Sequence, residues 1–137
     1  MKVVFITSEV VPFSKTGGLA DVAGALPIAL AELGIDVSVF SPYYSAVRKH
    51  PTERLPNLIT VPMGPRTEWG AVRRGGPFYF IEHDAFYNRS GLYGDGVSDY
   101  KDNLFRFVFL MRATLEFLAQ SGDPRALDLF EEMLSGK

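Results

Sequence analysis

The chain has 137 residues, about one domain, and 47% of them are hydrophobic against 22% charged. Fourteen basic and sixteen acidic residues give a formal net charge of −2, so bulk charge attracts neither nucleic acid nor an anionic membrane. The absence of cysteine excludes disulfides and thiolate metal sites and fits a reducing compartment. No apolar run approaches the ~18 residues that cross a bilayer, so we expect a cytoplasmic protein with no membrane partner.

The first element is an apolar, non-alternating run at residues 3–7, which is typical of a central parallel strand. The loop after it ends in Lys15-Thr16-Gly17-Gly18, where a helical pattern begins. Paired glycines allow a bound group to approach the backbone, and a helix N-terminus offers free N–H groups and a positive dipole end. Lys15 adds a mobile positive charge. We interpret this turn as a candidate phosphate-binding site, although a plain strand-to-helix turn would also favour glycine.

A helix is predicted over residues 19–33, with Gly34 as its stop. Pro27 lies inside this pattern, so we expect a kink or break there. A second strand over residues 36–41 would complete a βαβ unit. The expected buried face of the helix carries the apolar residues at helical spacing: Leu19, Val22, Ala23, Leu26, Leu30 and Leu33.

The next segment, residues 43–57, is predicted to be irregular with one short helical turn, before a short strand at 58–62. Two further strands, at 69–74 and 77–83, are joined by Gly75-Gly76, which suits a tight hairpin. The second of these two is apolar on both faces, so we expect it in the interior of the sheet.

The C-terminal part contains a loop over residues 84–99, a long apolar helix from residue 102, and a terminal amphipathic helix over 121–137 of the same domain. The loop is long for a structureless segment, which favours a functional role. Its Tyr87 and Tyr93 either stack on a sugar ring or anchor the loop. Together the elements predict an α/β fold that is Rossmann-like, with a mostly parallel sheet flanked by helices.

Other polar residues are interpreted as structural. His50 and His83 have no acidic cluster at ligand spacing, so no metal site is expected, and both are predicted to be hydrogen-bonded. Asp95, Asp99 and Asp102 are predicted to form turns or cap the following helix.

The sequence closely resembles the N-terminus of bacterial glycogen synthase and plant starch synthase. The resemblance rests on K-T-G-G-L-A-D-V at residues 15–22, flanked by residues 1–9 and 24–27. Later segments, 86–94 and 99–107, resemble the next signature of that family. The similarity covers about residues 1–118.

This resemblance implies an incomplete N-terminal half of a GT-B glycosyltransferase. Enzymes of that family transfer glucose from ADP-glucose to the non-reducing end of an α-1,4-glucan, with retention of configuration and without an essential metal or other cofactor. ADP-glucose and α-1,4-glucan are therefore the implied ligands. The resemblance assigns no catalytic residue within this chain.

The resemblance also implies roles for single residues. Lys15 would contact the sugar nucleotide, and the amides of Gly17 and Gly18 would face its diphosphate or glucosyl unit. Asp21 would either line the cleft or support the loop. Tyr93 would lie on the acceptor side.

The chain departs from the family pattern after residues 106–107, because the H-x-H-D-W motif and the second domain are missing. Residues 1–120 are therefore interpreted as a partial catalytic domain that is inactive alone, through truncation, a frameshift or a split gene. The alternatives are a non-catalytic module that binds glucan or sugar nucleotide, and one half of a split synthase. An incomplete sheet also predicts self-association through an exposed strand edge.

Overall fold

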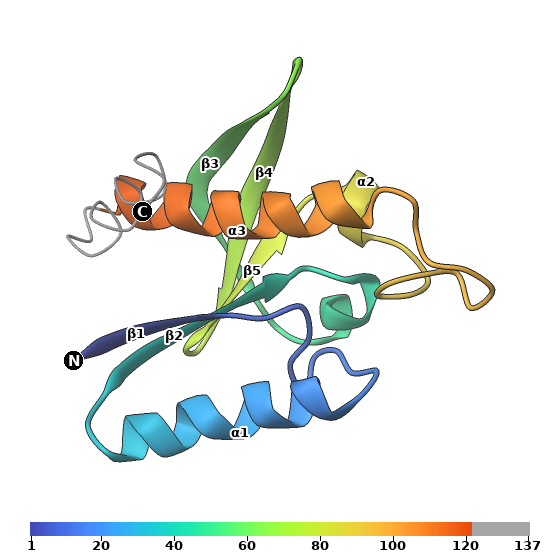
Figure 1. The fold of residues 1–137 in the computed structure, drawn as a ribbon. Helices are drawn as coiled ribbons and strands as arrows, with labels where there is room; N and C mark the ends of the chain where they lie inside the picture. Colours follow the sequence, from blue (N-terminus) through green and yellow to red (C-terminus); the bar gives the residue numbers. More distant parts are fainter. Residues whose placement is uncertain (122–137) are drawn as a thin grey trace.

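The computed structural model describes residues 1–121 and contains one five-stranded sheet with helices on both of its faces (Figure 1). The predicted terminal helix at 121–137 lies almost wholly outside the described residues. The elements, in chain order, are β1 (Lys2–Ile6), α1 (Gly18–Glu32), β2 (Asp36–Pro42), the 3₁₀ helix η1 (Ser45–Lys49), β3 (Glu53–Met63), β4 (Arg66–Gly75), β5 (Phe78–Glu82), α2 (Asp84–Tyr87) and α3 (Asn103–Gln120).

The strand order in the sheet is β1-β2-β5-β4-β3. The β1–β2 and β2–β5 pairs are parallel, whereas β4 pairs antiparallel with both β5 and β3. The α/β class is confirmed, and the sheet is mixed, with its parallel part at β1, β2 and β5. The βαβ unit of β1, α1 and β2 lies at this parallel end.

The predicted hairpin is confirmed at β4 and β5, where Gly75 pairs with Phe78. Gly76 has a φ of +61°, a backbone conformation that favours glycine. β5 lies between β2 and β4, as its apolar faces predicted. The irregular segment is shorter than expected, because β3 already begins at Glu53 and continues past a register shift between Arg54 and Leu58.

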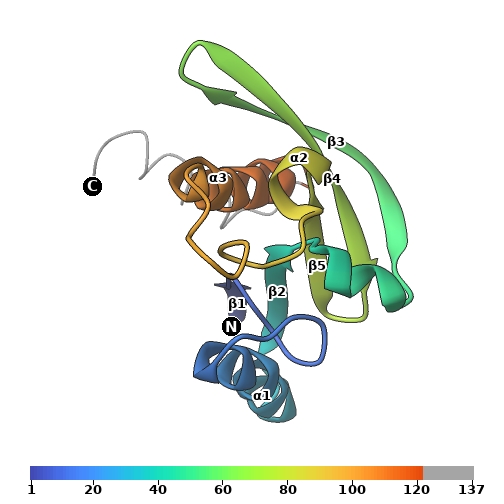
Figure 2. The same cartoon turned by 90° about the vertical axis from the view of Figure 1, so that its right-hand side faces the viewer.

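Two apolar layers cover opposite faces of the sheet. Alternate residues of β2 point to opposite sides, so Val37 and Val39 pack towards α1 with Val10 and Ala23. The larger cluster includes Phe40 of β2 and lies on the other face, under α3. Figure 2 shows α1 on one side of β1 and β2, and α3 on the other side, where the long β3–β4 ribbon curves past it.

The predicted buried face of α1 is confirmed at Ala23, which is buried, and at Leu30, which packs partly buried against the same cluster, but it is wrong at the other four positions. Leu19, Val22, Leu26 and Leu33 are exposed. The residues of α1 that are buried are small: Ala20, Ala23, Gly24 and Pro27. The physical reason is the loop after β1, which lies directly beneath the helix. A Cβ on Gly24 would lie 2.6 Å from Val11 Cγ2 and 2.9 Å from the Val11 carbonyl oxygen, so only small residues fit there.

The expected break at Pro27 is also absent, because α1 is continuous from Gly18 to Glu32. Pro27 lies on the buried side of the helix. The helix therefore presents Pro27 to the sheet layer and a stripe of larger apolar side chains to the outside.

Within residues 1–121, no helix is long and apolar enough to span a bilayer.

The close contact at Gly24 gives a stability prediction. Helix propensity alone favours Gly24→Ala by about 1 kcal/mol. We expect instead a loss of about 1–3 kcal/mol, since the new methyl group would overlap the Val11 backbone. Urea denaturation measures this difference. Gly18→Ala in the first turn of the same helix is the control, because no atom lies within 4 Å of its Cβ position. A more stable Gly24→Ala protein would contradict the prediction.

Candidate functional site

Two loops meet beyond the carboxyl ends of β1 and β2 (Figure 1). One follows β1 and contains the K-T-G-G turn at residues 15–18, and the other is the tyrosine-rich segment at 88–102. Ligands in α/β sheets commonly bind at this edge, where loops from neighbouring strands come together. The tertiary structure thus brings together the two segments that the sequence marked separately.

The carboxylate of Glu9 lies between these two loops and is only 2% exposed. Its Oε1 accepts hydrogen bonds from the backbone N–H groups of Gly17 and Ala20, both at 3.2 Å. Its Oε2 accepts from the hydroxyl groups of Thr16 at 2.5 Å and Tyr93 at 2.9 Å. Glu9 therefore caps the first turn of α1 and contacts the second loop as well.

This arrangement favours an ionised carboxylate. Burial raises the pKa of Glu9, but the hydrogen bonds from Thr16, Tyr93, Gly17 and Ala20 outweigh burial and hold the pKa below its ordinary value of 4.5. The Gly17 and Ala20 amides can only donate, and a protonated acid would require the Thr16 or Tyr93 hydroxyl to turn from donor to acceptor. The positive end of the α1 dipole favours the charge further.

The hydroxyl of Tyr93 contacts both Glu9 and its neighbour Ser8 in the loop after β1. Tyr93 has one proton, which it donates to Glu9, so the Ser8 hydroxyl donates to the Tyr93 oxygen at 2.7 Å. The hydroxyl of Tyr44 donates to the Ser8 carbonyl at 2.6 Å. Burial, followed by the neighbouring Glu9 carboxylate, raises the pKa of Tyr93. The phenol therefore stays protonated and donating.

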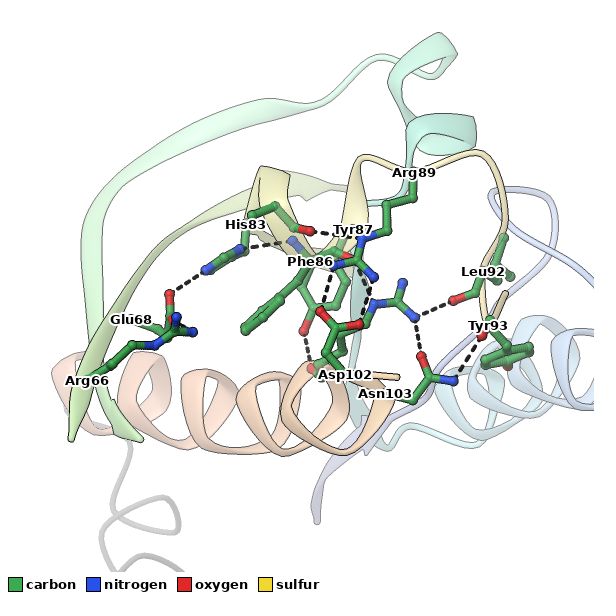
Figure 3. Close-up of polar contacts among 12 residues, drawn as sticks. Arg66, Glu68, His83, Phe86, Tyr87, Arg89, Leu92, Tyr93, Asp102 and Asn103 are labelled. Atoms are coloured by element: carbon green, nitrogen blue, oxygen red, sulfur yellow. Dashed lines mark hydrogen bonds and ion pairs between the residues drawn. The ribbon is translucent and has the colours of Figure 1, made fainter. Parts of the chain in front are cut away.

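The backbone of Tyr93 is held by α3. The Asn103 side chain donates to the Tyr93 carbonyl at 2.9 Å, and its own oxygen accepts from Arg106 at 2.8 Å (Figure 3). Tyr93 is thus fixed at both ends, by α3 through its carbonyl and by the β1–α1 loop through its hydroxyl.

Arg106 is a fully buried cation that organises the second loop. Its guanidinium donates to the carbonyl oxygens of Phe86 at 2.7 Å and Leu92 at 2.8 Å. It also lies 4.9 Å from the centre of the Tyr100 ring. Its Nη2 has no hydrogen-bond partner, and burial lowers the pKa of Arg106. Two backbone carbonyl groups, the Asn103 side-chain oxygen and an aromatic face stabilise this charge in place of a directly bound carboxylate.

Asp102 stands at the N-cap position of α3, as predicted, but its side chain makes no capping hydrogen bond. Both of its oxygens bind Arg89 instead, at 2.8 and 2.6 Å (Figure 3). This bidentate contact lowers the pKa of Asp102 and raises that of Arg89. The pair closes the loop from α2 to α3.

The predicted turn residues have separate environments. Lys15 is half-exposed and binds both oxygens of Asp21, at 2.8 and 2.9 Å. The Gly17 amide is already bound to Glu9, whereas Gly18 has no protein acceptor in the described part of the chain. Gly17 has an extended backbone that any residue adopts, and a Cβ on either glycine would meet no atom within 4 Å. Neither packing nor backbone conformation therefore requires glycine at these two positions. The space above the turn is open, and a ligand could approach the backbone there.

A cavity of about 550 Å³ adjoins this turn and is lined by Thr16 and the loop at 90–99, including Tyr93. Its charged lining residues are Asp95 and Asp99, and no lysine or arginine lines it. Asp95 acts as a turn residue, because its carboxylate accepts hydrogen bonds from the backbone N–H groups of Val97 at 2.8 Å and Ser98 at 2.9 Å. A lining of hydroxyls, carboxylates and one aromatic ring suits a neutral, hydroxyl-rich ligand better than an anion.

The histidines have structural environments. His83 accepts from the Phe86 amide through Nδ1, so its Nε2 carries the proton and donates to Glu68 at 2.9 Å (Figure 3). His50 packs edge-on against Phe13, and its buried Nε2 has no hydrogen-bond partner, contrary to the prediction. Among residues 1–121, no cluster of acidic and histidine side chains could hold a metal ion.

Sequence reasoning missed the residues that connect the site. Glu9 had no predicted role. Its signal was a carboxylate directly after an apolar strand and shortly before a helix without a capping side chain. Arg106 was hidden within an apolar helix, where a single arginine usually faces solvent.

The Glu9 network gives a pH prediction. Since the folded pKa lies below 4.5, its stabilisation is complete above about pH 4.5 and is lost as the pH falls through the folded value. We expect Glu9→Gln to lower the free energy of unfolding at pH 7 by about 1–3 kcal/mol. This difference from the native protein should shrink as the pH falls below 4.5. Urea denaturation at several pH values measures it, with Glu32→Gln at the exposed far end of α1 as control. A difference that is constant with pH would contradict the assignment.

Comparison with known proteins identifies the family. A family model described as the starch synthase catalytic domain matches residues 2–130. Glycogen synthases from Syntrophotalea carbinolica and Anaeromyxobacter dehalogenans are 45% and 47% identical, each alignment covering 94% of this chain and 28% of the relative. The catalytic domain of starch synthase IV from Arabidopsis thaliana, solved bound to ADP and acarbose, aligns with a TM-score of 0.73 at 28% identity, over 87% of this chain and 25% of that one.

These matches confirm the predicted resemblance and the GT-B fold class, and the family match continues past residue 118 to residue 130. The chain spans little more than a quarter of the length of the curated relatives that it matches. Since the family model covers nearly all of the chain, the protein belongs to the starch synthase catalytic domain family, together with the bacterial glycogen synthases.

Proposed function

We propose that this chain forms the front part of a glucosyltransferase that moves glucose from ADP-glucose to the non-reducing end of an α-1,4-glucan, with retention of configuration. The observation that carries the proposal is the junction of the open glycine turn with the cavity beside Tyr93 at one edge of the sheet. A donor and an acceptor must lie next to each other for transfer, and this junction offers two adjacent sites of different chemistry.

The donor side is proposed at the glycine turn. Glu9 already occupies the amides of Gly17 and Ala20. A diphosphate would therefore use the Gly18 amide and the Lys15 ammonium. The exposed Lys15–Asp21 pair contributes only about 0–1 kcal/mol, so a diphosphate can compete for the ammonium. Asp21 then supports the lysine in the free protein.

The acceptor side is proposed at the cavity lined by Thr16, Tyr93 and the loop at 90–99. The Tyr93 hydroxyl is bound on the inside by Glu9 and Ser8, so its ring is the part left to contact a sugar. A glucan presents neutral hydroxyls and apolar ring faces, which match this lining.

Lys15→Gln tests the donor side. We expect the affinity for ADP-glucose to fall about tenfold, since removing one charge-assisted contact costs roughly 1.4 kcal/mol or more. Isothermal titration calorimetry measures the affinity. Lys49→Gln, an exposed lysine on η1, is the matched control and should bind as the native chain does. Equal binding by Lys15→Gln would remove Lys15 from the donor site.

Transfer by the 137-residue chain alone provides a second test. We expect no incorporation of labelled glucose into glycogen from ADP-glucose. Activity should appear on mixing with a chain that supplies the remaining three quarters of a relative. Turnover by the chain alone would contradict the proposed incompleteness, and selective glucan binding without rescue would favour a non-catalytic module.

Self-association through β1 is the third expectation. β1 is an edge strand of the described sheet. Thr7 donates its N–H to β2, so the alternation of a strand turns the Ile6 N–H towards the open edge. The exposed apolar stripe of α1 adds association-prone surface.

We expect light scattering after gel filtration to show dimers or larger species that increase with concentration. Ile6→Pro removes one edge donor without touching the ladder to β2 and should shift the population towards monomer. Ile6→Val is the control. A concentration-independent monomer would rule out association through this edge.

The cytoplasmic location remains part of the proposal. It is supported by the absence of cysteine from the sequence.

A further inference from the structure

We propose that Glu9 is a positioning residue that holds the loop at 90–99, through Tyr93, against the glycine turn at 15–18. The proposed donor and acceptor sides of the site are thereby fixed relative to each other. The part that concerns ligands rests on the proposed function. The structural part does not, because it concerns contacts within the chain.

The first argument is the saturation of the carboxylate. A carboxylate offers about four lone-pair positions. Those of Glu9 are taken by Gly17, Ala20, Thr16 and Tyr93. Glu9 therefore has no acceptor capacity left for a ligand or for a transferred proton, and its effect on binding must pass through its partners.

The second argument is the connectivity of the loop at 90–99. In residues 1–121, side chains hold this loop to α3 through Asn103 and Arg106. Its hydrogen bonds to the β1–α1 side all converge on the Tyr93 hydroxyl, through Glu9 and Ser8. The contact with Glu9 joins residues that are 84 positions apart in the sequence. Loss of the Glu9 contact would leave Ser8 as the remaining bond across this junction.

The third argument is the sign of the required charge. Four donors converge on two oxygens, and the Gly17 and Ala20 amides can only donate. With its oxygen on those two amides, the side chain of Glu9→Gln would turn its NH₂ group towards the Thr16 and Tyr93 hydroxyls, which would then accept instead of donate and lose their charge-assisted bonds. Glu9→Gln thus keeps the side-chain volume and removes about half of the acceptor capacity. It is a selective probe of the junction.

The first test needs no ligand. NMR spectra at pH 7 report the Tyr93 ring and the amides of Gly17 and Ala20. We expect Glu9→Gln to shift all three sets of signals and to speed amide hydrogen exchange at Gly17 and Ala20. Asp21→Asn is the control, because it makes the same carboxylate-to-amide change in the first turn of α1 at a residue that binds Lys15 and not Glu9. It should leave the NMR signals of the Tyr93 ring unchanged. Unchanged Tyr93 signals in a folded Glu9→Gln protein would overturn the proposal.

Tyr93→Phe reads the junction from the other side, including the case in which Glu9→Gln does not fold. It removes only the hydroxyl and leaves the ring in the cavity lining. We expect the side-chain carboxyl carbon signal of Glu9 to move in response. A Glu9 signal identical to that of the native chain would show that the contact does not couple the two loops.

Ligand binding provides the functional test, with maltohexaose as the probe in calorimetry. We expect Glu9→Gln and Tyr93→Phe each to weaken binding about tenfold, and the double variant to be no weaker than the weaker single variant, since both break one contact. Glu32→Gln is the control. A double variant weakened about a hundredfold would mean independent roles and would overturn the positioning role.

Failure of the proposed function has a different signature. If the native chain binds neither maltohexaose nor ADP-glucose, the binding assignments of the chain fail. The Tyr93 ring signals in Glu9→Gln then still decide the role of Glu9, with a shift supporting it and no shift overturning it.

Discussion

The carboxylate of Glu9 against the first turn of α1 is the contact on which the site depends. It neutralises the positive end of the helix, satisfies the Gly17 and Ala20 amides and binds the hydroxyl of Tyr93. A buried charge is costly unless it is fully hydrogen-bonded, and here every acceptor position is used. Burying the charge is unfavourable unless all four donors bind it, so the positions of Gly17, Ala20, Thr16 and Tyr93 around Glu9 are tightly constrained.

This contact changes how the glycine turn can bind an anion. A helix N-terminus is ordinarily a ready anion site, but the internal carboxylate already occupies part of it. What remains exposed is the Gly18 amide, the open space above both glycines and the Lys15 ammonium, shared with Asp21. The acidic, hydroxyl-rich cavity adjoins the turn at Thr16, which is one of its lining residues. Charge therefore divides the edge of the sheet into an anion-compatible part and a part suited to neutral ligands.

Arg106 gives the second loop its shape in a comparable way. Its guanidinium uses backbone carbonyls and aromatic faces as partners, so the loop must wrap around α3 at fixed points. Through Asn103 this constraint reaches the carbonyl of Tyr93. Tyr93 is therefore held at both ends by charged residues. Arg106 acts on its backbone carbonyl through Asn103, and Glu9 accepts from its hydroxyl.

The sequence by itself determined the βαβ unit, the Gly75-Gly76 hairpin, the interior position of β5 and the family, because these follow from local patterns of apolar residues, turns and motifs. Tertiary structure alone decided which face of α1 is buried, since the loop after β1 excludes large side chains at Gly24. It also decided the partners of Glu9 and Arg106. Periodicity cannot predict these, because each depends on donors or carbonyls that the chain brings back from distant segments, and a buried charge shows its compensation only once those segments are folded together.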